Sequence, residues 1–310
     1  MPTIEVVLPL KIHTHEGASD LERFSTLLLP SFDRFCSFKD ELKFLLVVPE
    51  GDLSEVVGCI EKLGRPNMRV ECEDNLCPAL KGESGWHKQQ ILKLAAAKVV
   101  SSDYYLLLDA DVILKRPTKL LDLFPSGKPI LQKINAGHHL DWWVGSRKIL
   151  KSNVQIERDS IVMDVTPNFL HRETCLALQD VIASRNKTNE WDRFLFDSRQ
   201  TGWTEYSLYW LYTLECGLDQ QLYDWSSRQM YEFIWESCQL SPQHLHRIFA
   251  PDSNSFFLVV QSNLNLDLSV IRMQTLPYLG GQDAQSPATS KRGPLKKLRE
   301  YLTRDALKLF

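Results

Sequence analysis

The sequence predicts an α/β domain over residues 1–281, with a mostly parallel central sheet flanked by helices. Three short apolar stretches lack the polar and apolar alternation of a half-exposed strand: IEVVLPL at 4–10, KFLLVVP at 43–49 and YYLLL at 104–108. Such stretches are typical of strands buried on both faces of a parallel sheet. Segments with helical apolar spacing separate them, and a β-α-β-α-β order favours parallel pairing with right-handed crossovers.

The remaining elements follow from apolar periodicity and from the positions of glycine and proline. We expect strands at 4–10, 43–49, 68–72, 104–108, 160–170 (ending in a Thr-Pro turn) and 256–260, and helices at 20–30, 52–63, 86–100, 171–183 and 204–217. Residues 131–147 hold two histidines and two tryptophans around a glycine. This segment fits either a surface loop whose tryptophans cover the core, or a sugar-binding segment whose aromatic faces stack on a pyranose ring.

The composition limits the possible classes of function. The chain has 310 residues, 44% of them hydrophobic, a formal net charge of −3 and a pI near 6.3. It is long enough for a sizeable core, and its charge gives no general reason to bind nucleic acid. Seven scattered cysteines without metal-ligand spacing favour reduced, buried thiols. The N-terminus lacks a signal-peptide pattern and no apolar run reaches the roughly 18 residues of a membrane span, so we expect a cytoplasmic protein.

The C-terminal end differs in composition from the rest of the chain. Residues 282–294 are rich in Gln, Ser, Pro, Ala and Gly, which predicts a linker. Residues 295–310 have leucines at helical spacing with lysines and arginines around them, which predicts a basic amphipathic helix. Such a helix either binds anionic lipid peripherally on the inner face of the plasma membrane or folds back onto the domain.

The most informative stretch is 86–117. An amphipathic helix is expected to lead into the buried strand 104–108, and Asp109-Ala110-Asp111 follows where that strand ends. Ligands of open α/β sheets bind outside the carboxyl ends of the strands. Two carboxylates so close to a core carry a large desolvation cost, which a shared hard divalent cation removes. The residues therefore predict a Mg²⁺ or Mn²⁺ site for a phosphorylated ligand, with structural capping of the next turn as the alternative.

A buried strand that ends in Asp-x-Asp, after a helix that carries Gln and Lys, resembles the nucleotide-sugar glycosyltransferases of the GT-A (Rossmann-like) fold. The resemblance is clearest over 86–117 and extends more weakly to about residue 262, where it is similar to uncharacterised bacterial GT-A-like proteins. It implies metal-dependent transfer of a sugar from a nucleotide-diphosphate donor, UDP by default, to a hydroxyl of a glycan or glycolipid acceptor. It also implies a nucleotide-binding half over 1–118, an acceptor half over 119–281 and a role in bacterial surface polysaccharide synthesis.

On the donor side, the resemblance implies that Asp109 and Asp111 hold a cation that bridges the diphosphate. Pro9 and Lys11, at the carboxyl end of the first strand, are expected beside the base or ribose. Lys93 shares a helix face with Gln89 and is expected to reach a phosphate as a point charge, unless it lies on a solvated helix face.

On the acceptor side, Glu205 is the first candidate for the base that takes the proton from the attacking hydroxyl, and Asp164 is the second. In a retaining enzyme either carboxylate would instead face the donor ring. Glu205 also fits a structural role, because a carboxylate in the first turn of a helix interacts favourably with the helix dipole. His246 is the candidate third metal ligand, since this fold often takes a late histidine. The HLH segment around it also fits a solvated loop, as does the histidine pair at 138–139.

Two other functions fit parts of the sequence. The stretch LLLDADVIL at 106–114 is similar to the motif of Mg²⁺-dependent haloacid-dehalogenase-type phosphatases, with Asp109 as nucleophile and Asp111 as acid and base. That motif usually opens its domain, whereas three strands are expected before it here, and no Gly-Asp-x-x-x-Asp follows. A non-catalytic carbohydrate-binding protein is the other alternative, since eight tryptophans allow sugar stacking.

Overall fold

The computed structural model describes residues 4–12, 19–226, 228–261, 264 and 267–279. The expected linker at 282–294 and the expected amphipathic helix at 295–310 lie outside these ranges. Within them, none of the helices has the length and hydropathy that a bilayer crossing requires.

The main sheet has five strands in the order β3-β2-β1-β4-β8. These strands are β1 Ile4–Pro9, β2 Lys43–Val48, β3 Met68–Cys72, β4 Tyr104–Leu107 and β8 Asn168–His171. The first four run parallel to one another, and β8 pairs antiparallel with β4. The predicted mixed α/β architecture with a mostly parallel sheet is therefore confirmed.

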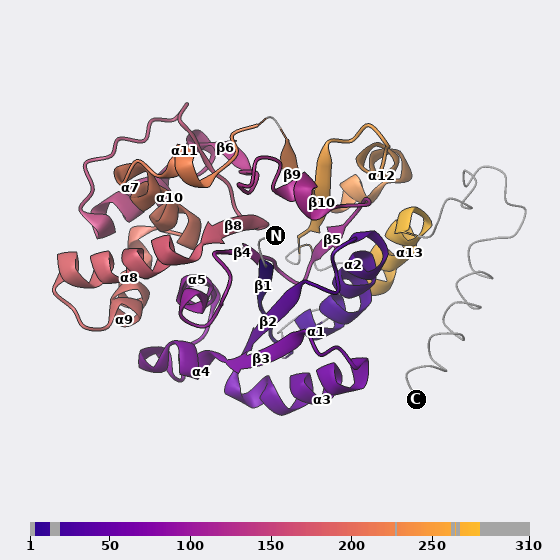
Figure 1. The fold of residues 1–310 in the computed structure, drawn as a ribbon, viewed down its shortest axis with the longest axis horizontal. Coiled ribbons are helices and arrows are strands. Elements are labelled where there is room, and N and C mark those ends of the chain that lie inside the picture. Colours follow the sequence, from indigo (N-terminus) through magenta and orange to yellow (C-terminus); the bar gives the residue numbers. More distant parts are fainter. Residues whose placement is uncertain (1–3, 13–18, 227, 262–263, 265–266, 280–310) are drawn as a thin grey trace, which may run out of the picture.

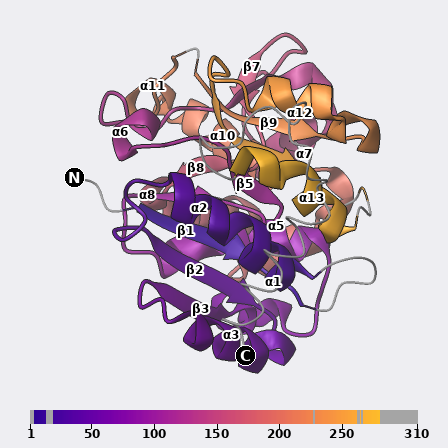
Figure 2. The same ribbon diagram turned by 90° about the vertical axis from the view of Figure 1, so that its right-hand side faces the viewer.

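Helices cover both faces of this sheet, as the apolar strands require. Those that precede β4 are α1 Asp20–Arg23, α2 Leu29–Phe35, α3 Leu53–Leu63, α4 Glu73–Leu76 and α5 Trp86–Ala95, with a π-helical turn between α1 and α2. In Figure 1, α5 lies on one side of β1 and α2 on the other, and Figure 2 shows α2 in front of the stacked strands β1, β2 and β3.

The strand order contains a topological switch point. From β1 the chain builds β2 and then β3 outward on one side, and it then returns to place β4 on the other side of β1. In an open α/β sheet, ligands bind in the crevice outside the carboxyl ends of the two strands at such a switch point, which here are β1 and β4. The segments at this crevice are the ones that follow Pro9 and Leu107.

A second sheet, which the sequence did not reveal as a unit, has the order β5-β10-β9. Its strands are β5 Val112–Leu114, β9 Gln229–Ile234 and β10 Ser255–Val260, and β10 runs parallel to β9 and antiparallel to β5. The chain crosses from the first sheet to the second through the Asp-x-Asp segment. The Leu108 amide donates to Val7 in the first sheet at 3.1 Å, and the Val260 amide donates to the Asp111 carbonyl at 3.1 Å.

The rest of the chain supplies a helical layer and a small two-stranded sheet. The later helices are α6 Leu120–Leu123, α7 Leu140–Leu150, α8 Arg172–Asn186, α9 Trp191–Asp197, α10 Glu205–Glu215, α11 Asp219–Leu222, α12 Pro242–Ile248 and α13 Leu268–Leu279. The small sheet pairs β6 Lys133–Asn135 with β7 Ile161–Met163. In Figure 1, α7, α8, α9 and α10 gather on one side of β4, and β9 and β10 lie on the other.

Two expectations need correction. Residues 131–147 do not form a surface loop: they contribute β6 and most of α7, in which Trp143 is 5% exposed. The expected strand 160–170 is divided, because β7 pairs with β6 and the chain then turns into β8 of the main sheet. Both errors concern segments whose partners are distant in sequence or sit in different sheets.

Candidate active site

A cavity of about 400 Å³ lies at the switch point between β1 and β4. Strand ends, one face of α5, the first turn of α7 and the start of α10 contribute its walls. The side chains that line it are Pro9, Asp20, Trp86, Gln89, Gln90, Lys93, Asp109, Ala110, Asp111, Trp142, Val165, Thr166, Thr204, Glu205, Tyr206, Trp235, Val259 and Gln261.

Most of the residues predicted from the sequence meet in this cavity. Asp109 and Asp111 follow the carboxyl end of β4, and Ala110 between them is 4% exposed, so the tight connection to β5 holds both acids at the cavity. The Asp109 side chain is 35% exposed, whereas Asp111 is 6% exposed. Two oxygen-donor side chains of different accessibility thus lie where the sheet topology places a ligand.

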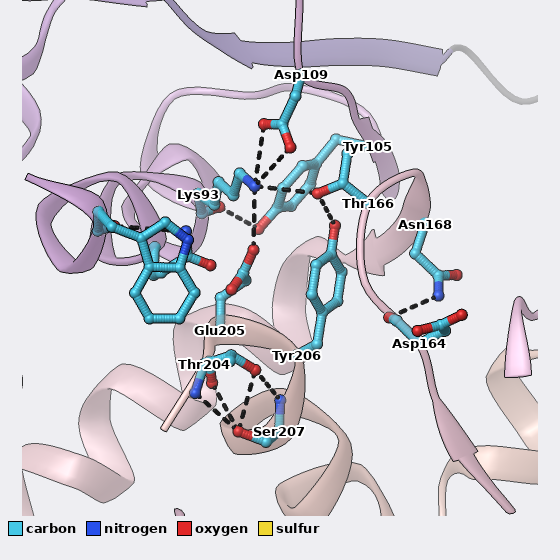
Figure 3. A network of polar contacts seen from close by, with 12 residues as sticks. Lys93, Tyr105, Asp109, Asp164, Thr166, Asn168, Thr204, Glu205, Tyr206 and Ser207 are labelled. Atoms are coloured by element: carbon cyan, nitrogen blue, oxygen red, sulfur yellow. Dashed lines mark hydrogen bonds and ion pairs between the residues drawn. The ribbon is translucent and has the colours of Figure 1, made fainter. Parts of the chain in front are cut away.

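Lys93 joins the two halves of the site (Figure 3). Its ammonium lies 3.1 Å from Asp109 Oδ1 and 3.2 Å from Glu205 Oε1, and it donates to Thr166 Oγ1 at 3.0 Å. The side chain is 3% exposed, so the interpretation as a solvated helix face is wrong. A buried ammonium persists only when it is paired, and here one carboxylate comes from each side of the cavity.

Glu205 is buried at the start of α10, with 1% of its side chain exposed. Thr204 caps the helix by accepting from the Ser207 amide at 3.0 Å, which fixes the residue that follows it. Gln90 faces the same carboxylate, and the hydrogen-bond partners around it assign its amide nitrogen to the Glu205 side. In that orientation the nitrogen contacts both Glu205 oxygens, Oε1 at 2.7 Å, and the Gln90 oxygen accepts from the Trp86 indole at 3.3 Å. The carboxylate is therefore held from two directions by side chains of α5.

The electrostatics of this network follow from burial and from pairing. Burial disfavours the charge on Lys93, but Asp109 and Glu205 outweigh it, so the pKa of Lys93 lies above its usual value. Burial raises the pKa of Glu205, and the nearby ammonium of Lys93 offsets only part of that rise. A carboxylate with a raised pKa is a stronger base than an ordinary one, which suits it to proton transfer.

Asp164, the second candidate base, does not line the main cavity. Its carboxylate accepts from the Tyr231 hydroxyl at 2.6 Å and from the Val165 amide at 2.9 Å. Burial raises its pKa, and these hydrogen bonds oppose that rise. These hydrogen bonds hold Asp164 in the turn that carries Val165 and Thr166 to the cavity.

The other predicted residues lie in different places. Pro9 lines the cavity, whereas Lys11 lies in a small adjoining hollow and its amide donates to Asp20 Oδ2 at 3.1 Å. His246 lies on the exposed side of α12 and is absent from the cavity lining, so the structure does not bring it to Asp109 and Asp111. The expected loop around His246 is a helix.

The sequence reasoning missed several cavity residues. Asp20 lies on the same cavity as the Asp-x-Asp pair, and burial raises the pKa of its carboxyl. Trp235 and Gln261 come from the ends of β9 and β10, and the Gln261 amide donates to the Ile234 carbonyl at 3.2 Å. The only local signal for Asp20 was an acid at the start of a helix, and Trp235 depends on a pairing of strands that local pattern does not encode.

The carboxylate oxygens of Asp109 and Asp111 suit a hard cation that takes its remaining ligands from water and substrate. Among the residues described, no cluster of three His, Cys, Asp or Glu side chains has the geometry of a metal site. Mg²⁺ typically takes one or two protein carboxylates and fills the rest of its shell with water and substrate phosphate. Asp109 and Asp111 match that pattern, and thiolate or histidine ligands, which softer metals favour, do not line the cavity.

Comparisons with known proteins give one sequence family and several distant structures. No curated protein matches the sequence. Mouse xyloside xylosyltransferase 1 aligns with a TM-score of 0.49 and 13% identity, covering 84% of this chain and 98% of that chain. The galactosyltransferase LgtC, in complex with donor and acceptor sugar analogs, aligns with a TM-score of 0.44 and 10% identity, covering 92% and 98%. The glycosyltransferase GlyE of Streptococcus pneumoniae aligns with a TM-score of 0.40 and 12% identity, covering 98% and 64%.

Because these TM-scores are below 0.5, the function has to be argued from the residues of the site. The sequence, in contrast, matches a family model over most of its length. This family model matches residues 1–281, a range that includes every residue the structure describes. The chain belongs to the family described as Family of unknown function (DUF6492).

Proposed function

We propose that the protein is a metal-dependent glycosyltransferase that moves a sugar from a nucleotide-diphosphate donor to a hydroxyl of a glycan acceptor. UDP is the first candidate nucleotide. The observation that carries the proposal is the position of Asp109 and Asp111 at the switch point of the sheet, on a cavity of about 400 Å³ that also reaches the buried carboxylate of Glu205. Small-molecule sites have volumes of roughly 300–1,000 Å³, and the cavity lies within that range.

The charges around the cavity support a cation between protein and substrate. Four carboxylates, those of Asp20, Asp109, Asp111 and Glu205, line it against the single ammonium of Lys93. A nucleoside diphosphate is itself an anion and would be repelled by this wall. A divalent cation on Asp109 and Asp111 removes the repulsion, which is why a phosphorylated donor and a metal are proposed together.

Sugar transfer needs a stabilised leaving group and an activated acceptor. A Mg²⁺ or Mn²⁺ ion held by Asp109 and Asp111 would supply Lewis-acid stabilisation to the departing diphosphate. Lys93 fixes the orientation of Asp109 and of Glu205 through its ion pairs of 3.1 and 3.2 Å. Glu205, with its raised pKa, takes the proton from the acceptor hydroxyl at a carboxylate oxygen.

A turnover assay with a panel of nucleotide sugars tests the proposal. We expect release of the nucleoside diphosphate that requires Mn²⁺ or Mg²⁺ and stops with EDTA. Asp111→Ala should abolish this release, because one of the two cation ligands is gone. The matched control is Asp180→Ala, which removes an exposed aspartate of α8 outside the cavity and should leave the rate unchanged.

Two results would overturn the proposal. One is full activity in Asp111→Ala. The other is release of phosphate from a phosphomonoester such as p-nitrophenyl phosphate without turnover of any nucleotide sugar, which would favour a phosphatase. Binding of sugars without turnover of either substrate class would favour a carbohydrate-binding protein.

A further inference from the structure

Three tryptophans line the cavity, and they lie on different elements. Trp86 is the first residue of α5, Trp142 lies in the first turn of α7, and Trp235 directly follows β9. Trp86 is 47% exposed and Trp235 is 43% exposed. Aromatic side chains that line a cavity and remain partly exposed are available for contact with a ligand.

The tryptophans divide into two groups by their neighbours. The ring centroids of Trp86 and Trp142 lie 6.2 Å apart with an interplanar angle of 35°, so the two indoles are neighbours, and the part of the cavity that they line is called the Trp86–Trp142 corner below. Trp235 instead follows β9, and the Ile234 carbonyl at the end of that strand accepts from the Gln261 amide. The neighbouring Val260 amide donates to the Asp111 carbonyl. Trp86 and Trp142 are therefore the pair associated with α5 and α7, and Trp235 belongs to the Asp111 side.

The Trp86–Trp142 corner is connected to the buried carboxylate. With the Gln90 amide nitrogen assigned to the Glu205 side, the Trp86 indole donates to the Gln90 oxygen at 3.3 Å and the Gln90 nitrogen contacts Glu205 Oε1 at 2.7 Å. On its other side, Trp142 stacks on His139 at 3.9 Å and 14°, which covers one face and fixes the ring. In this corner Trp142 is held by its stacking on His139, whereas Trp86 is 47% exposed. Through Gln90 the corner is connected to Glu205, the carboxylate proposed to act as base.

We propose that this corner is an acceptor subsite that binds one pyranose ring, with the exposed face of Trp86 as its stacking surface. The inference rests on the proposed function and gives the place where its saccharide acceptor binds. A pyranose has an apolar C–H face that suits an aromatic plane and a polar rim that needs hydrogen-bonding groups. The cavity offers both kinds of surface, since the polar side chains of Gln89 and Thr204 line it as well as the indoles. A ring seated there presents a hydroxyl toward Glu205.

Transfer kinetics with methyl pyranosides as acceptors test the subsite. For Trp86→Ala we expect the acceptor KM to rise at least about tenfold, the size of effect that the loss of one aromatic anchor produces, while the donor KM changes little. Trp86→Phe keeps a stacking face and loses the indole N–H, so it should keep most of the acceptor affinity. The control is Leu121→Ala, an apolar side chain 70% exposed on α6 and remote from the cavity lining, which should change neither KM.

Saturation-transfer NMR on the same methyl pyranosides gives a readout that needs no turnover. The wild-type protein should saturate ring C–H protons of at least one pyranoside, and Trp86→Ala should lose that signal. Saccharide binding that depends on Trp86 without nucleotide-sugar turnover would retain the subsite and refute the transferase.

Three results overturn the subsite. One is turnover with an acceptor KM indifferent to Trp86→Ala. Another is a rise in the donor KM instead, which would mean that the indole stacks on the nucleobase. The third is equal loss in Trp86→Phe and Trp86→Ala, which would assign the effect to the hydrogen bond with Gln90.

Discussion

Lys93 is the side chain on which the geometry of the site most depends. It is 3% exposed, and its ammonium is shared between a carboxylate at the carboxyl end of β4 and another at the start of α10. Removing one partner of a buried ion pair leaves an uncompensated charge, which costs far more than the pair itself contributes. The same lysine therefore links the stability of the site to its chemistry.

The first prediction concerns that buried pair. We expect Lys93→Met to lower the free energy of unfolding by about 3–5 kcal/mol, because Glu205 is left buried without its counter-charge. Lys93→Met with Glu205→Gln should lose less than the two single variants combined, since the second change removes the stranded charge. Chemical denaturation of the four proteins measures both values, and strictly additive losses would contradict the account.

The pH dependence of that penalty has a definite sign. In Lys93→Met, burial still raises the pKa of Glu205, and the ammonium that lowered this pKa in the wild type is absent. A carboxyl with a raised folded-state pKa contributes stability that is present below its ordinary value near 4.5 and is lost as pH rises through the folded-state value. The deficit of Lys93→Met relative to wild type should thus shrink as pH is lowered, and a constant deficit would argue against a charged Glu205.

Glu205 and Asp164 can be separated as candidate bases by a pair of isosteric variants. Glu205→Gln should reduce kcat by about 100- to 10,000-fold, the contribution of a positioned base. Asp164→Asn should keep most of the activity, because Asp164 lies outside the cavity lining and its oxygens already accept from Tyr231 and Val165. The reverse ranking of the two variants would exchange their roles.

The pH profile of the wild-type enzyme provides a further check on Glu205. As a base it must be ionised, so kcat should fall as pH is lowered through its pKa, and burial places this fall above the ordinary value of 4.5. Lys93 and Asp109 are the charged groups that set how far above it lies. The residual activity of Glu205→Gln should lack this acid limb.

At the scale of elements, the decisive feature is the short connection between β4 and β5. It leaves one sheet at Leu108, enters the other at Val112 and is tied to both by backbone hydrogen bonds of 3.1 Å. Neither carboxylate can therefore move far without disturbing two sheets. A rigid scaffold of this kind is what a cation site and a positioned substrate require.

The packing of α7 against the segment before α10 gives an element-scale prediction. A Cβ at Gly145 would lie 1.5 Å from the Gly202 carbonyl oxygen, a backbone atom that cannot rotate away. Gly145→Ala should therefore be strongly destabilising, by about 3 kcal/mol or more, or should displace α7 together with Trp142. The control is Gly58→Ala in α3, where a Cβ meets nothing within 4 Å, and helix propensity predicts a gain of about 0.5–1 kcal/mol.

At the scale of the whole molecule, the sequence was informative where structure is local. Strands β1 to β4 and helices α3 and α5 each carry their own apolar pattern, and the positions of Asp109 and Asp111 follow from the end of one strand. The sequence did not reveal β9 or β5, because β5 has three residues and pairs with β10, far along the chain. Trp235 and Gln261 reach the cavity because β9 pairs with β10 and β10 with β5, so the spacing of residues could not predict them.

The candidate site divides in the same way. Glu205 was found because helix capping by Thr204 is a local signal, but its ion pair with Lys93 joins residues on two elements far apart in sequence. His246 was predicted as a metal ligand only from its place late in the chain, and it lies on the exposed face of α12 instead. The sequence can therefore identify candidate catalytic and ligand residues, whereas the ion pairs between them depend on how the elements are arranged in the fold.

The most direct measurement is calorimetric titration of UDP into the protein with Mn²⁺ and with EDTA. Because Asp109 and Asp111 would bind the diphosphate only through a shared cation, we predict binding that requires Mn²⁺ and that Asp111→Asn abolishes, while Asp180→Asn binds like wild type. Equal UDP affinity in EDTA, or in Asp111→Asn, would contradict a metal-bridged nucleotide at this cavity.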